Sequence, residues 1–137
     1  MMKLLRMDFV PGSVDFGLLV LRAWLGLTML LNHGWAKLVG FQAKSGSFPD
    51  PLGIGSAPSL GLAVFAEVVC ASLLVVGLFT RFAAFNLAVT MAVAFALVHD
   101  GALSGANSGE LAFVYMGGVV ALFLAGGGKL SLDGRSR

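Results

Sequence analysis

A single carboxylate interrupts an otherwise apolar run of this sequence. The run extends from Leu62 to Phe79, and Glu67 is its only charged residue. Ionisable side chains at membrane depth are energetically costly, and they usually face a protein interior or a water-filled cavity. Glu67 is therefore either a neutral hydrogen-bond donor or one half of an ion pair. It serves either as a link between helices or as a participant in proton-transfer chemistry.

Further polar side chains lie in apolar surroundings. They are Arg22, Asn32, His33, Lys37, Asn86, His99, Glu110 and Tyr115. From a rise of 1.5 Å per helical residue, we place Glu67 roughly 18 Å from the Phe79 end of its segment. Asn32 and His33, on the first apolar segment, lie slightly further than Glu67 from the membrane side at which Phe79 lies. The sequence predicts a polar cluster in one half of a bundle, built from Glu67, His33 and Asn32, with Tyr115 and His99 as further candidates.

Several of these residues also have simpler explanations. Arg22 can extend its side chain to the nearer headgroups, or it can pair with Glu67 across a depth difference of about 10 Å. Lys37 is expected to anchor the end of the first segment at the membrane surface. His99 is interpreted as an interfacial histidine. Glu110 can stabilise a helix N-terminus through the helix dipole.

The sequence predicts no metal site and no redox centre of its own. Two histidines and two glutamates do not match the spacing of a metal-ligand motif. Cys70 is the only cysteine, so an internal disulfide and a CxxC pair are excluded, and we expect it to be a small packing residue. Redox chemistry would therefore require a partner protein or an exchangeable cofactor.

The composition indicates that a lipid bilayer is the natural solvent of this chain. Of its 137 residues, 58% are hydrophobic and 12% are charged, and the mean hydropathy is +0.92. Soluble domains carry about 25% charged residues, and a domain this small could not bury so much apolar surface. The net charge is +2 without a basic run, which excludes a nucleic-acid-binding surface.

Four stretches approach the roughly 17–25 apolar residues that a transmembrane helix needs. We predict them at about 16–37, 58–79, 81–98 and 110–126, within a single membrane domain covering 1–137. The short link "FTRF" makes the second and third helices antiparallel neighbours. The predicted fold class is an all-α integral membrane bundle of four helices. We expect the first helix to be retained, because the N-terminus lacks the cleavage pattern of a signal peptide.

The distribution of basic residues predicts the orientation. Most of them fall on one side of the four predicted helices, namely Lys3, Arg6, Arg22, Arg81, Lys129, Arg135 and Arg137. Cytoplasmic segments of membrane proteins are enriched in Lys and Arg, so both termini are predicted to be cytoplasmic. Small residues predict where helices approach closely: Ala84, Ala88, Ala92 and Ala96 form one stripe, and Ala63 and Ala71 flank Glu67.

Three segments together resemble one known family. They are "LRAWLGLTMLLNHGWAKLVGF", "FAEVVCASLLVVGLFTRFAAFNLAVTMAVA" and "GELAFVYMGGVVALFLAGGGKLSLD". The first is similar to the Arg-bearing first helix of the DoxX family, which ends in a Gly-x-x-Lys segment. The second resembles the family's Glu followed by Gly-Leu-x-Thr-Arg, and the third its Glu-Leu-Ala and closing Ser-Leu-Asp. The resemblance covers Leu18 to Asp133, with "GGGK" where the family carries Gly-Pro-Gly and a basic residue.

The resemblance implies a four-helix protein of the bacterial or archaeal cell membrane. Some relatives are subunits of a thiosulfate:quinone oxidoreductase, and others are associated with superoxide dismutase and a sulfurtransferase. We therefore expect a membrane subunit that links a redox protein partner to quinone. Glu67 and His33 are the candidates for proton transfer. Asn32, His33, Glu67, Tyr115 and His99 are the candidates for binding the headgroup.

Two alternatives to this function remain open. The chain is otherwise a non-enzymatic scaffold or assembly subunit, or a small transporter, for which four short helices would have to oligomerise. A cavity of about 300 Å³ or more, lined by apolar groups with a few polar ones, favours quinone binding. A tightly filled interior favours the scaffold.

Overall fold

The computed structural model describes residues 2–136, and within this range the chain is helical, with no β-strand. The predicted all-α class is therefore confirmed. Among the cations that predict the orientation, Arg137 and the side chain of Lys3 lie outside the described residues.

Each of the three long helices contains a π-helical segment. The first runs through α2 (Val14–Met29), the π-helical η1 (Leu30–Gly34) and α3 (Trp35–Val39). The second runs through α5 (Ser56–Val64), the π-helical η2 (Phe65–Cys70) and α6 (Ala71–Val76). The third runs through α7 (Thr80–Val93) and the π-helical η3 (Ala94–Val98). The remaining helices are α1 (Met2–Leu5), α4 (Phe41–Lys44), α8 (Glu110–Ala125) and α9 (Leu132–Arg135).

The three long helices are long and apolar enough to cross a membrane. They have 26, 21 and 19 residues, and each carries at most two charged residues in its most apolar window. The shorter α8 is also apolar, but its 16 residues extend only about 24 Å, against about 30 Å for the hydrocarbon core. The chain is a membrane protein with three helices of full spanning length and a shorter fourth.

The second long helix ends three residues earlier than predicted. The second helix ends at Val76 because Gly77 adopts φ +72°, a left-handed conformation that favours glycine. The amide groups of Gly77 and Leu78 donate back to the carbonyl oxygens of Leu74 and Leu73, at 3.2 and 3.0 Å. This hydrogen-bond pattern is a Schellman cap. The connecting turn therefore consists of residues 77–79 instead of the predicted "FTRF".

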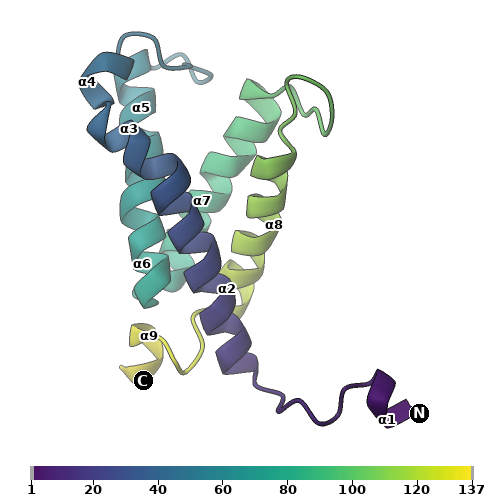
Figure 1. Cartoon of the computed structure of the whole chain (residues 1–137). Coiled ribbons are helices and arrows are strands. Elements are labelled where there is room, and N and C mark those ends of the chain that lie inside the picture. Colours follow the sequence, from purple (N-terminus) through teal and green to yellow (C-terminus); the bar gives the residue numbers. More distant parts are fainter. Residues whose placement is uncertain (1, 137) are drawn as a thin grey trace.

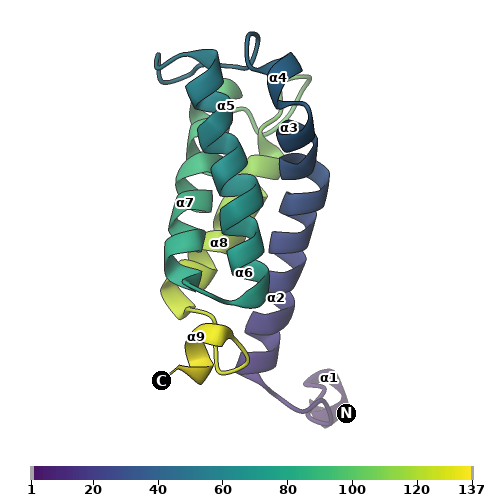
Figure 2. The ribbon, with the colours of Figure 1, turned by 90° about the vertical axis from the view of Figure 1, so that its left-hand side faces the viewer.

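The helices form two pairs that pack together at one end and diverge at the other (Figure 1), and Figure 2 shows the bundle from the side, with α5 and α6 in front of α8. In one pair α2 packs along α6, and in the other α7 packs along α8. The buried core lies between the pairs and includes Cys70, Leu74, Ala84, Leu87, Val119 and Leu122. Both α1 and α9 lie at the closed end, whereas α4 and the α7–α8 connection lie at the open end (Figure 1).

The first and second long helices touch through their backbones. A Cβ atom on Gly34 would lie 2.4 Å from the carbonyl oxygen of Glu67, and one on Gly26 would lie 2.8 Å from that of Ala71. Only glycine fits at such a contact, because any side chain would push the helices apart. Small residues therefore bring the backbone of Glu67 against the first helix, in line with packing in a bilayer.

Arg22 holds the closed end together from inside the protein. Its residue exposure is only 1%, so the expectation that it extends to the headgroups is wrong. The guanidinium donates hydrogen bonds to the carbonyl oxygens of Leu74 and Val75 at the end of α6, and to that of Leu130 at 2.6 Å. The carbonyl oxygen of Val75 lies in the last turn of α6, where carbonyl groups lack a donor from within the helix, and this explains why the arginine stays buried instead of reaching water.

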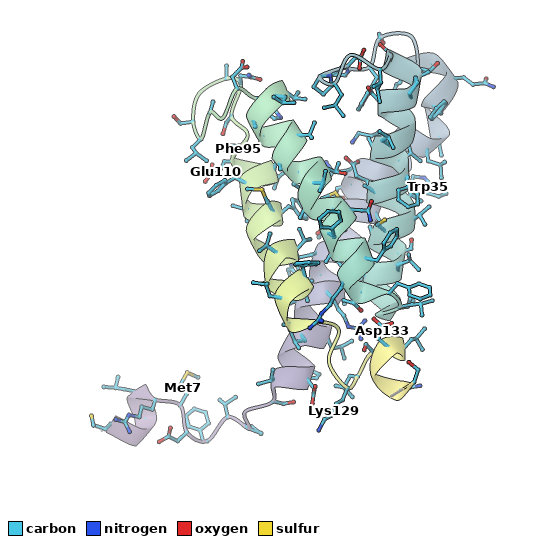
Figure 3. All side chains as sticks on the ribbon, turned by 180° about the vertical axis from the view of Figure 1, so that it is seen from behind. Met7, Trp35, Phe95, Glu110, Lys129 and Asp133 are labelled. Carbon is cyan, nitrogen blue, oxygen red and sulfur yellow. The ribbon has the colours of Figure 1, made fainter. Side chains whose placement is uncertain are left out.

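The C-terminal segment closes the same end by capping α7 and by bonding to the first turn of α2. The carboxylate of Asp133 accepts hydrogen bonds from the amides of Phe79 and Thr80 at 2.8 Å each, where α7 begins. Asp15, in the first turn of α2, accepts one from the amide of Lys129 at 2.8 Å. Figure 3 shows Asp133 and Lys129 near one another below the bundle. The segment after α8 is therefore an integral part of the bundle.

Candidate functional site

A cavity of about 500 Å³ lies between the diverging helix pairs. All three long helices, α8 and the loop before α5 contribute to its walls. In Figure 3 the labelled Glu110 and Trp35 stand on the opposite arms that flank this open half. The volume lies within the range of ligand pockets, roughly 300–1,000 Å³, so this half of the bundle is not tightly filled.

An ion pair between Lys37 and Glu67 forms the polar end of the cavity. Lys37 Nζ lies 2.6 Å from Glu67 Oε2, and the two side chains are 21% and 7% exposed. Lys37 Nζ also donates a longer hydrogen bond, 3.5 Å, to the carbonyl oxygen of His33. The expectation that Lys37 only anchors a helix end is therefore wrong. Glu67 is half of an ion pair that joins the first two long helices.

His33 and Tyr115 lie together beside this pair. Their ring centroids are 5.8 Å apart and the rings are nearly perpendicular, at 86°. His33 comes from η1, whereas Tyr115 comes from α8 and is 8% exposed. Both residues line the cavity together with Glu67. The structure thus brings three of the predicted residues to one place from three different helices.

Two of the three π-helical segments carry site residues, and the third leads into one. His33 lies in η1, Glu67 lies in η2, and His99 follows directly after η3. A π-turn widens the helix and shifts the direction of the side chains that follow, and such segments are frequent at functional sites. The sequence carries no simple signal for a π-turn, so this feature escaped the sequence analysis.

The remaining predicted residues lie in different surroundings. His99 lines the cavity near the open end, with Nδ1 3.2 Å from the carbonyl oxygen of Asn107. Asn32 is exposed and does not line the cavity, so its predicted place in the cluster is wrong. Neighbouring helix residues point about 100° apart, and with His33 turned inward Asn32 is turned out. Glu110 is also exposed and outside the cavity.

A loop fixed by hydrogen bonds lines the open end of the cavity. Phe48, Pro49, Pro51 and Leu52 of this loop line the cavity. The carboxylate of Asp50 accepts hydrogen bonds from the amides of Ile54 and Gly55 at 2.9 and 2.8 Å, and from the hydroxyl of Ser59 at 2.9 Å. These contacts tie the loop to the start of α5, where a negative charge also suits the helix dipole.

The pH dependence of this loop follows from Asp50. The amide of Gly55, with Ser59 and Ile54, stabilises the ionised form and holds the pKa of Asp50 below its ordinary value of 3.8. A carboxylate with a lowered folded-state pKa contributes stability above its unfolded pKa and loses it as the pH falls through the folded value. We therefore expect the loop to stay tied to the start of α5 at neutral pH and to loosen only below pH 3.8.

Amide hydrogen exchange at neutral pH tests the role of Asp50. In Asp50→Ala the amides of Ile54 and Gly55 should exchange about tenfold faster or more, because their acceptor is lost. Asp100→Asn, at an exposed position on the other loop of the same end, is the control and should leave both amides protected. Unchanged protection in Asp50→Ala would contradict this account of the loop.

The cavity combines apolar walls with one polar end that carries no net charge. Met29, Phe65, Val89 and Met91 are among its apolar lining residues. The ammonium of Lys37 and the hydroxyl of Tyr115 are donors, Glu67 is an acceptor, and a neutral imidazole provides one of each. The arrangement suits a largely apolar ligand whose polar atoms are carbonyl or hydroxyl oxygens.

Comparisons with known proteins agree with this picture of a membrane protein. A family model described as DoxX matches residues 17–100. One uncharacterized protein of Haemophilus influenzae is 36% identical over 112 residues, covering 78% of this chain and 81% of its own length. A second from the same organism is 30% identical over 137 residues, covering 96% of this chain and 89% of its own length. No solved structure matches the chain.

Proposed function

This chain belongs to the DoxX family of membrane proteins, and we propose that it is a quinone-linked membrane subunit of a redox or detoxification system. The observation that carries the proposal is the Lys37–Glu67 ion pair at the end of an apolar cavity, with His33 and Tyr115 beside it. A quinone has a planar, mostly apolar ring, which fits the apolar cavity walls, and two carbonyl oxygens, which can accept hydrogen bonds from Lys37 and Tyr115.

We place the protein in the cell (inner) membrane as a multi-pass protein whose four apolar helices all cross the bilayer. The short α8 would reach across with the help of the glycine-rich turn that follows it. The closed end, with Arg81, Lys129 and Arg135, would face the cytoplasm, because cytoplasmic loops are enriched in basic residues. The cavity then lies in the outer half of the membrane.

In this proposal the ion pair binds and protonates the headgroup. When bound, a quinone supplies the two-electron, two-proton redox chemistry, with both electrons delivered by a partner redox protein. Lys37 would donate a hydrogen bond to one carbonyl oxygen of the quinone, and Tyr115 would be a second donor. Glu67 and His33 hold and pass on protons, as side chains within hydrogen-bond reach of a reacting oxygen can do.

Quinone binding to purified variants tests the proposal. Wild-type protein in mild detergent should bind a quinone, and Glu67→Gln should weaken the affinity about tenfold or more, because Lys37 loses the partner that holds its ammonium in place. Glu110→Gln is the matched control, since that carboxylate is exposed and lies outside the cavity. The proposal fails if Glu67→Gln binds quinone as wild type does, or if wild type binds none.

The structure also offers an observation in favour of a scaffold. Arg22 and the C-terminal segment fill and fasten the closed end, which is what an assembly subunit needs. For a scaffold, Glu67→Gln lowers stability, while the proteins that co-purify with the chain and any quinone content stay the same. Mass spectrometry of the co-purifying proteins and of extracted quinone distinguishes these outcomes.

A further inference from the structure

We propose that the cavity takes a long-tailed isoprenoid quinone that enters sideways from the bilayer, between α5 and α7. This inference rests on the proposed function and adds to it the ligand's tail and its route. A quinone tail of many isoprene units is longer than a cavity of about 500 Å³ can enclose. The tail therefore has to leave the protein through an apolar opening.

The helix packing leaves such an opening on one side. The third long helix packs against η2 and α6, but α7 has few contacts with α5. Figure 3, seen from behind, shows the upper parts of these two helices diverging on that side. Cavity residues lie along both of the diverging helices, so the divergence is continuous with the cavity.

The outward-facing side chains at this opening are apolar. Leu62, Phe65 and Val89 line the cavity, and they are also 54%, 38% and 46% exposed. Side chains that border a cavity and also face outward from a membrane helix lie where lipid chains and cavity meet. An apolar tail can pass here without desolvating any charged group.

The polar residues on the α7 side of the rim use their donors within their own helix. Asn86 Nδ2 donates to the carbonyl oxygen of Phe82 at 2.8 Å, and Thr90 Oγ1 donates to that of Asn86 at 2.9 Å. They therefore offer little hold for a headgroup on its way in. The charged groups of the cavity lie at its Lys37–Glu67 end, which favours a ligand with one polar end and one apolar end.

The other approach to the cavity is bordered by an apolar loop. The loop held by Asp50 places Phe48, Pro51 and Leu52 along the end that carries the long connections. A water-soluble ligand would have to pass this apolar loop, whereas a lipid-soluble ligand reaches the side opening by diffusion in the membrane. The side route therefore fits a membrane-borne quinone better than a soluble one.

Tryptophan at the opening tests the route. The full chain in lipid nanodiscs is titrated with a long-tailed isoprenoid quinone and with the same headgroup without its tail. We expect Val89→Trp to weaken binding of the long-tailed quinone about tenfold or more and to change the tail-less analogue by less than about twofold. Val69→Trp is the control, because Val69 is also 46% exposed but does not line the cavity. It should bind both ligands as wild type does.

The outcomes separate this inference from the proposed function. If wild type binds neither ligand, the proposed function is wrong and the inference falls with it. If wild type binds both but Val89→Trp weakens both equally, or neither, the side route is wrong and quinone binding stands. Should Val89→Trp fail to fold, Leu62→Trp on the facing helix carries the same expectation.

Discussion

Replacing Arg22 by methionine should lower the free energy of unfolding by about 3 kcal/mol in mild detergent, with the fold otherwise retained. The methionine fills much of the same space but removes the donors that the carbonyl oxygens of Leu74, Val75 and Leu130 share. Arg22 is 1% exposed, so water cannot replace the lost donors without opening the closed end. Hydrogen bonds from charged groups to buried acceptors are among the more stabilising contacts in proteins.

Equilibrium unfolding of wild type and variants measures this effect. Arg81→Met is the matched control, because Arg81 is exposed and donates only to the carbonyl oxygen of Leu124 at 3.2 Å. Its loss should cost less than about 1 kcal/mol. Arg22→Lys should fall between the two, since an ammonium is a point charge without the flat fork of a guanidinium. Equal stability of Arg22→Met and wild type would show that the buried network is dispensable.

Most of the fold could be predicted from the sequence, because long apolar stretches in a bilayer form helices. Each predicted long helix appears within a few residues of its expected bounds, and the main shift comes from the left-handed Gly77. The buried place of Arg22 could not be predicted, since its acceptors come from the end of α6 and from Leu130, far along the chain. Such contacts depend on how helices are aligned in space, which one sequence does not reveal.

The same limit explains what the sequence predicted of the site. Glu67 stood out because a carboxylate in an apolar run needs a protein environment, and the structure gives it one. The sequence also contains a signal that places Lys37 in the site. Lys37 follows His33 by four residues, so both side chains lie on one helix face. By the same rule Asn32, next to His33, points elsewhere.

Breaking the Lys37–Glu67 pair should show that it serves both stability and binding. Lys37→Met or Glu67→Gln alone should each cost about 2 kcal/mol of stability, because each leaves a largely buried group without its partner. The double variant should cost only about 1 kcal/mol, since neither charge remains. The resulting coupling is typical of residues in direct contact. Lys129→Met, at an exposed lysine outside the cavity, should change neither property.

Ligand binding by the same variants separates a functional pair from a structural one. If the pair holds a quinone headgroup, all three variants should lose affinity about tenfold or more, and the double variant should not recover although its stability does. A purely structural pair predicts the opposite, because restoring stability would restore the cavity and its affinity. Recovery of quinone binding in Lys37→Met/Glu67→Gln would therefore remove both residues from the chemistry and leave Tyr115 and His33 to bind the headgroup.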